Sequence, residues 1–211
     1  RGHRSLQSLH RGVPQHAEAP SAYYQQGYCR EILGQYEQAA EAFRTLAARY
    51  SADPLAPDAL YRCGENLYNT SHFQEALEAY LQVGDKYPQS PFAEKALYSA
   101  SWTYMDLNQE RESIATMARL VEAYPRGDYS RYAQFSIGDY YYAHQEFERA
   151  RSAYRQVVDH YPGTSEAEKA AGLLAELEED LANQAYDEIL AEFDRGNYEA
   201  AVRGFEQIYT Q

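Results

Sequence analysis

Two segments of the sequence, KYPQSPFAEKA (86–96) and HYPGTSEAEKA (160–170), carry nearly the same phrase 74 residues apart. Each contains Tyr-Pro, a hydroxyl residue two places after the proline, and Ala-Glu-Lys-Ala. A shift of half that distance, 37 residues, aligns the chain with itself in six columns. The columns are Tyr50/Tyr87/Tyr124/Tyr161, Tyr24/Tyr61/Tyr98/Phe135, Gly27/Gly64/Ser101/Gly138, Ala39/Ala76/Ser113/Ala150, Phe43/Tyr80/Met117/Tyr154 and Leu46/Val83/Leu120/Val157. A fixed period of this size is typical of stacked supersecondary units.

Each repeat is predicted to form two helices. In the second repeat, APDALYRCGENLYNT (56–70) has a proline suited to the first helical turn and apolar residues at helical spacing. After a polar break, FQEALEAYLQVGDKY (73–87) places a second apolar stripe on one helix face before Pro88 stops it. The repeated phrase therefore marks junctions. Tyr-Pro ends one helix, and Ser90 or Thr164 is expected to cap the next.

The period breaks toward the C-terminus. The segment GNYEAAVRGFEQIY (196–209) matches GQYEQAAEAFRTLA (34–47) at an offset of 162, which is not a whole number of repeats. Because no proline occurs between Glu166 and Arg195, the sequence predicts one long helix over about 165–194. A break near Asn183 is the alternative. The expected organisation is a flexible tail over 1–18, four helix pairs over 19–164, and the long helix with an incomplete terminal repeat over 165–211.

Composition and charge argue against two classes of partner. The chain has a net charge of −13, and residues 19–211 hold 16 basic and 31 acidic residues, so phosphate backbones would be repelled and nucleic acid is not an expected partner. No apolar run approaches the ~18 residues of a membrane span, so direct membrane insertion is not expected either. Two cysteines are too few for a disulfide scaffold; whether Cys29 and Cys63 form a bridge is left open.

Signatures of enzyme chemistry are missing from the sequence. There is no P-loop, no G-x-S-x-G, no H-E-x-x-H and no G-x-G-x-x-G. His3, His10 and His16 lie in the tail, and His72, His144 and His160 lie near predicted helix ends. We therefore expect no catalytic residue, no metal site and no cofactor.

The repeat columns also carry a family resemblance. The pattern Leu60-x2-Cys63-Gly64-x2-Leu67, Ala76-x3-Tyr80 and Pro88 resembles the tetratricopeptide repeat, and the fourth repeat shows the same spacing. The resemblance implies an all-α fold, a right-handed superhelix (α-solenoid) of antiparallel helix pairs with the 37-residue period. The long junction is similar to that of the bacterial cell-envelope subgroup, which includes the outer-membrane assembly lipoprotein BamD and the TolA-binding periplasmic proteins. This implies a periplasmic or outer-membrane-associated location, with the cytoplasm as the alternative.

In repeat arrays of this family the first helices line the concave surface. The residues on that face that do not point at the partner helix form a stripe rich in aromatic rings, which suits a groove for an extended peptide or a helix. The candidate groove residues are Tyr24, Tyr28, Glu31, Tyr61, Glu65, Tyr68, Tyr98, Trp102, Met105, Tyr132, Phe135, Asp139 and Tyr142. The alternative is that these rings pack into the seams between repeats. Seam packing is favoured for the column that begins with Tyr24, and the groove for Tyr28, Tyr68, Trp102 and Tyr142.

The sequence thus predicts a non-catalytic scaffold that binds a segment of another protein in an aromatic groove, within a bacterial envelope complex. The acidic inner residues favour a neutral or basic segment. Two alternatives remain open. The chain could be a self-assembling oligomerisation module, or a positioning arm of a larger enzyme or secretion machine.

Overall fold

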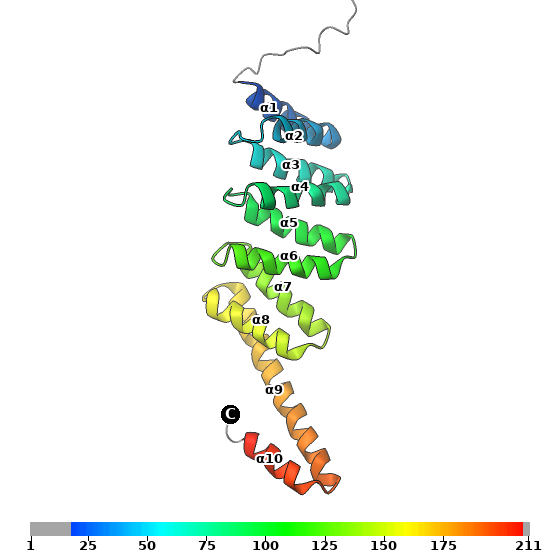
Figure 1. Ribbon diagram of the computed structural model, residues 1–211, viewed down its shortest axis with the longest axis vertical. Helices are drawn as coiled ribbons and strands as arrows, with labels where there is room; N and C mark the ends of the chain where they lie inside the picture. The colour runs from blue at the N-terminus through cyan, green and yellow to red at the C-terminus, as the bar shows by residue number, and fades with distance from the viewer. Residues whose placement is uncertain (1–17, 209–211) are drawn as a thin grey trace, which may run out of the picture. The chain divides into compact units, whose positions relative to one another are not determined.

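The structure is a computed structural model, and it describes residues 18–208. These residues form ten α-helices and no strand, which confirms the all-α prediction. The chain divides into two compact units, one up to Thr116 and one from Met117 onward. Within each unit, consecutive helices run antiparallel (Figure 1). The expected tail, including His3, His10 and His16, lies outside the described residues except for Glu18.

The first eight helices follow the 37-residue period. The first helices of the repeats are α1 (Ala19–Ile32), α3 (Ala56–Asn69), α5 (Ala93–Asp106) and α7 (Ser130–Ala143). The second helices are α2 (Tyr36–Arg49), α4 (Phe73–Lys86), α6 (Glu110–Ala123) and α8 (Phe147–His160). In both sets, each helix starts 37 residues after the previous one. The helices that precede a Tyr-Pro pair end immediately before its tyrosine, as the junction pattern predicts.

A left-handed residue closes each first helix. Gly34, Ser71, Asn108 and Gln145 stand at the same register with φ between 57° and 71°. In the first repeat, the amides of Gly34 and Gln35 donate to the carbonyls of Glu31 and Arg30. This bonding satisfies the last carbonyls of the helix and turns the chain back into the hairpin.

The helix caps differ between the junctions at Tyr87-Pro88 and Tyr161-Pro162. Thr164 caps α9 as expected, since its Oγ1 accepts a hydrogen bond of 3.2 Å from the amide of Ala167. The prediction for Ser90 is wrong. Its Oγ accepts from the amide of Phe92 within the turn, Phe92 itself is already in the right-handed region, and α5 begins only at Ala93.

Close contact between paired helices depends on the glycine column. A Cβ atom added at Gly64 would lie 2.6 Å from the ring of Tyr80, and one at Gly138 would lie 2.5 Å from the ring of Tyr154. Both rings are 1% exposed and lie in the centre of their hairpins. In the third repeat the same two columns hold Ser101 and Met117, and both side chains are buried.

The C-terminal helices depart from the period. Helix α9 (Ser165–Asp194) is continuous through Asn183, so the alternative of a break there does not occur. Helix α10 (Tyr198–Ile208) follows a short turn at Gly196, whose φ is +84°. None of the helices in residues 18–208 combines the length and apolar character that a membrane crossing requires.

Candidate functional site

The structure separates the thirteen candidate groove residues into buried, half-buried and exposed groups. Tyr61 is buried at 4% exposure. The half-buried group comprises Tyr24, Glu31, Glu65, Tyr98, Met105 and Phe135. The exposed group comprises Tyr28, Tyr68, Trp102, Tyr132, Asp139 and Tyr142, and its five aromatic side chains are between 36% and 43% exposed.

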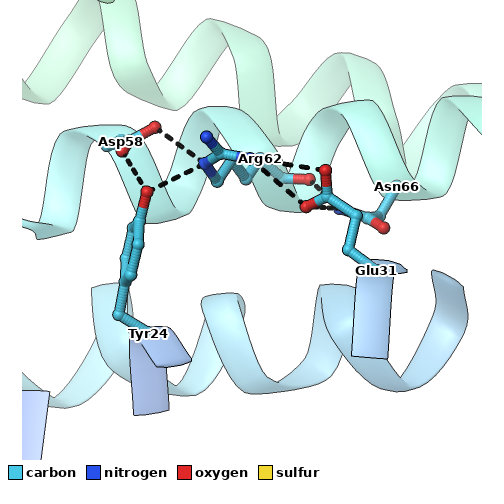
Figure 2. Close-up of polar contacts among 5 residues, drawn as sticks. All are labelled: Tyr24, Glu31, Asp58, Arg62 and Asn66. Atoms are coloured by element: carbon cyan, nitrogen blue, oxygen red, sulfur yellow. Dashed lines mark hydrogen bonds and ion pairs between the residues drawn. The ribbon is translucent and has the colours of Figure 1, made fainter. Parts of the chain in front are cut away.

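Tyr24 belongs to the seam between the first two repeats. Figure 2 shows Tyr24 and Glu31 of α1 reaching polar side chains of α3. The Tyr24 hydroxyl donates to Asp58 at 2.5 Å and accepts from Nε of Arg62 at 2.9 Å. Glu31 forms an ion pair of 3.3 Å with Arg62 and accepts from the Asn66 amide at 3.2 Å. Arg62 thereby links two side chains of α1 to α3.

Tyr61 fills the corresponding position in the next seam of unit 1. Its ring stacks on Phe92 with centroids 6.1 Å apart and an interplanar angle of 25°. The ammonium of Lys95 lies over the same ring, 4.6 Å from its centroid, in cation–π geometry. Tyr24 and Tyr61 therefore hold neighbouring first helices together and leave little surface for a partner.

Two of the candidate acids accept hydrogen bonds from buried tyrosines of their own hairpins. The Tyr80 hydroxyl donates to Glu65 at 2.6 Å, and the Tyr154 hydroxyl donates to Asp139 at 2.7 Å. Sequence reasoning missed this pairing, although a signal was present. Where the second helix carries Phe43 or Met117, which cannot donate, the first helix carries an aromatic residue, Tyr28 or Trp102, in place of the acid.

This pairing predicts a loss of stability at alkaline pH. Burial, followed by the hydrogen bond to the Glu65 carboxylate, raises the pKa of Tyr80 far above the usual value. The unfolded chain loses this proton above pH ~10 while the folded chain keeps it, so the stabilisation is complete below pH ~10 and declines above it. Between pH 8 and pH 11 the decline amounts to about 1.4 kcal/mol for this one group.

The measurement compares urea unfolding of the wild type with that of Tyr80→Phe at both pH values. The difference between the two free energies of unfolding should shrink by that amount, because the variant has no phenol to titrate. Parallel pH curves for the two proteins would contradict the assignment.

The exposed aromatics are supported by their neighbours. In unit 1, the Tyr68 ring packs edge-on against Phe73 at 5.2 Å, and its hydroxyl donates to Asp106 at 2.6 Å. Trp102 packs edge-on against Tyr98 at 6.1 Å. In unit 2, the ring of Tyr142 packs edge-on against Phe147 with centroids 5.8 Å apart. Tyr142 and Phe147 stand two repeats after Tyr68 and Phe73, so the same contact recurs. Such support lowers the conformational entropy that a ring loses when it binds a partner.

Two clefts lie at matching register, one in each unit. The cleft in unit 1 has a volume of 240 Å³ and is lined by Arg44, Cys63 and Glu75, and the cleft in unit 2 has a volume of 570 Å³. Arg44 and Glu75 form an ion pair of 2.8 Å. Burial raises the pKa of the Cys63 thiol, which disfavours the reactive thiolate. Cys63 and the exposed Cys29 are both free, and residues 18–208 hold no cluster of three or more His, Cys, Asp and Glu side chains that could bind a metal ion.

Comparisons with known proteins agree on the repeat. Sequence models described as tetratricopeptide repeat match residues 33–91, 95–126 and 132–164. A comparison with curated protein sequences finds no match.

Solved structures share the arrangement of helices. A tetratricopeptide repeat protein from Parabacteroides merdae is similar at a TM-score of 0.61 and 16% identity, over 92% of this chain and 67% of that chain. The fragment from residue 41 to the end of MamA from Desulfovibrio magneticus RS-1 is similar at a TM-score of 0.53 and 18% identity, over 92% and 95%. The apo form of RapI is similar at a TM-score of 0.54 and 12% identity, over 97% and 86%. Identities this low establish a common fold alone.

Proposed function

Because the chain belongs to the tetratricopeptide repeat family, we propose that it is a non-catalytic scaffold that binds a segment of another protein along the exposed aromatic residues of its first helices. Tetratricopeptide repeat proteins generally mediate protein–protein interaction.

One observation supports this surface above all. In unit 1, Tyr28 on α1, Tyr68 on α3 and Trp102 on α5 remain exposed, although Tyr24 and Tyr61 on the same helices are used in seams. We call these three residues the aromatic face of unit 1. Tyrosine and tryptophan offer large, stiff contact area with a polar tip and are enriched at the energetic centres of interfaces. In unit 2, Tyr132 and Tyr142 on α7 present rings of the same kind.

The charge of the chain favours a neutral or basic segment. The net charge is −13, and Glu65 and Asp106 stand on the same first helices as the aromatic face. Both side chains accept hydrogen bonds from tyrosine hydroxyls. A basic segment would therefore be attracted, and an acidic one repelled, with a dependence on salt.

The proposed setting is a bacterial envelope complex, in the periplasm or at the outer membrane. Support comes from the long Tyr-Pro junction in the sequence, which is similar to that of the envelope subgroup. Fractionation of cells that express the full-length parent protein, followed by detection with an antibody, tests this setting. Recovery from the cytoplasmic fraction alone would reject it.

Partner capture tests the aromatic face. We expect the double variant Tyr68→Ala, Trp102→Ala to lose at least tenfold in affinity for the captured partner, because the loss of two exposed interface aromatics is expected to cost more than about 1.4 kcal/mol. The measurement is a pulldown with the purified chain, identification of the partner, and titration of that partner against each variant. Leu33→Ala is the control, since Leu33 is an exposed apolar residue just after α1 that is not one of the three residues of the aromatic face. Equal affinity for the double variant, with unchanged circular dichroism, would reject this surface.

A further inference from the structure

The seam between α1 and α3 holds a cation of the chain itself between aromatic rings and acids. The guanidinium of Arg62 lies 5.8 Å from the ring centroid of Tyr24 and 5.6 Å from that of Tyr28. It also forms ion pairs of 3.3 Å with Glu31 and with Asp58 (Figure 2). Cation–π contacts and ion pairs thus act together on one guanidinium, which its planar shape permits.

The next seam of unit 1, between α3 and α5, also combines rings with acids. On α3, Glu65 and Tyr68 are three residues apart and share one helix face. On α5, Trp102 and Asp106 are four residues apart and share a face in the same way. The Tyr68 hydroxyl joins the two helices, because it donates to Asp106 at 2.6 Å. We call these four residues the seam cluster.

The seam cluster is accessible and negatively charged. Tyr68 is 36% and Trp102 is 43% exposed, Asp106 is exposed, and Glu65 is half-buried. The hydrogen bond to Asp106, followed by burial and by the charges of Asp106 and Glu65, raises the pKa of Tyr68. Both acids therefore act on the same ring, and a cation placed beside that ring would meet both of them.

The two acids of the seam cluster have no cationic partner in the part of the chain that the structure describes. Within residues 18–208, neither Glu65 nor Asp106 takes part in an ion pair, and each accepts a hydrogen bond from a tyrosine hydroxyl. Glu31, in the preceding seam, is paired with Arg62. The seam cluster thus has rings and acids like those around Arg62, without the cation.

The repeat register explains why the cation is missing. The position of Arg62 on α3 corresponds to Ser99 on α5, 37 residues later, and the serine side chain is short and uncharged. Lys95 precedes Ser99 by four residues, but its ammonium lies over the ring of Tyr61, 4.6 Å from the centroid. The chain therefore fills the first seam with its own arginine and leaves the second one open to a cation from outside.

We propose that the seam cluster binds an arginine side chain of the partner segment. The guanidinium would lie against the rings of Tyr68 and Trp102 and pair with the two carboxylates, as Arg62 does one seam earlier. Arginine suits this place better than lysine, because its planar guanidinium stacks on rings and forms two parallel hydrogen bonds with a carboxylate. The inference rests on the proposed function, and it names the partner residue that the aromatic face recognises.

The test begins with a phage-displayed library of short random peptides, selected on the immobilised 211-residue chain. Peptides that also bind the double variant Tyr68→Ala, Trp102→Ala are discarded, so the remaining ones depend on the rings. We expect arginine to be enriched at one fixed position of these peptides. Replacing that arginine with norleucine should weaken binding about tenfold in fluorescence anisotropy. Trp102 is the only tryptophan of the chain, so a change in its emission places the bound peptide at the cluster.

Neutralising the acids tests their part without disturbing the tyrosines. The double variant Glu65→Gln, Asp106→Asn removes both charges and keeps an oxygen that accepts from each tyrosine hydroxyl. It should weaken the arginine peptide about fivefold and leave the norleucine peptide unchanged. The matched control is Glu41→Gln, Glu78→Gln, which removes two exposed charges from the second helices α2 and α4 and should leave both peptides unchanged.

A cation supplied by the chain itself should compete with the peptide. Ser99→Arg places a guanidinium at the register of Arg62, and it should weaken the arginine peptide about tenfold. Ser99→Met has a long side chain without charge and should retain binding. Circular dichroism confirms that each variant is folded, and the neutralised variant decides the matter if Ser99→Arg is not.

Several results would overturn the proposal. These are equal binding of the arginine and norleucine peptides, unchanged binding by the neutralised variant, or selection of no peptide that depends on the rings. Selected peptides that depend on the rings but carry no arginine would also overturn it, while supporting the aromatic face as a binding surface. The titration of the captured partner against the Tyr68→Ala, Trp102→Ala variant still decides the proposed function, so the two failures are distinguishable.

Discussion

Replacing Gly64 with alanine is expected to lower the free energy of unfolding by about 2 kcal/mol, measured by urea titration with circular dichroism. The new Cβ would lie 2.6 Å from a ring carbon of Tyr80, and that ring cannot move aside easily because it is buried and its hydroxyl is bound to Glu65. The loss should appear although alanine favours a helix over glycine by roughly 1 kcal/mol.

A second glycine gives the matched control for this prediction. Gly172 lies inside α9 with no atom within 4 Å of an added Cβ, so Gly172→Ala should stabilise the protein by about 0.5–1 kcal/mol. The sequence of the third repeat suggests a rescue, because it carries serine and methionine at these two register positions. The double variant Gly64→Ser, Tyr80→Met should recover most of the stability that Gly64→Ser alone loses. Equal effects of alanine at Gly64 and Gly172 would contradict the proposed contact between α3 and α4.

Replacing Asn183 with proline is expected to have the largest effect, at least about 3 kcal/mol on the helix that contains it. Proline lacks the amide hydrogen and its ring would clash with the carbonyl of residue 179, in the middle of α9. The N-terminal half of α9 is anchored in the core through Ala170 and Leu177, whereas the C-terminal half packs against α10. Amide hydrogen exchange should therefore accelerate in residues 184–208 and stay slow in α7 and α8.

Asn183→Ala is the control for the proline variant. Asn183 is exposed, so alanine removes no buried contact and should leave exchange unchanged or slower. Amide hydrogen exchange in α10 that is as slow in the proline variant as in the wild type would contradict this prediction. It would mean that the packing of α10 does not depend on a continuous α9.

Much of the fold was predictable because the repeat pattern records helix packing directly. Phe43, Tyr80 and Tyr154 recur in one column because each ring is buried against a glycine of the paired helix. Tyr-Pro marks helix ends because proline cannot continue a helix. Ser90 was predicted wrongly because a hydroxyl residue after Tyr-Pro can bond within the turn as well as cap a helix, and sequence does not distinguish these.

The candidate site was less predictable because the alignment of the repeats gives the position of a residue within its helix but does not identify the residues that its side chain contacts. Arg62 was not singled out in the sequence, yet it joins Tyr24 and Glu31 across a seam, because its partners lie more than thirty residues away. Glu65 and Asp139 were considered as acids for a partner, and their bonds to buried tyrosines became visible only when the two helices of a hairpin were placed together. Ser71 and Gln145 adopt left-handed turns that their residue types do not favour.

Site-specific photocrosslinking tests the central claim, that the exposed aromatics of the first helices contact the partner. A photoreactive phenylalanine would replace Trp102 on α5, Tyr28 on α1, or Gln82 on the second helix α4, one at a time. The account predicts that the same partner crosslinks from positions 102 and 28 and not from position 82. Crosslinks from position 82 alone would contradict it.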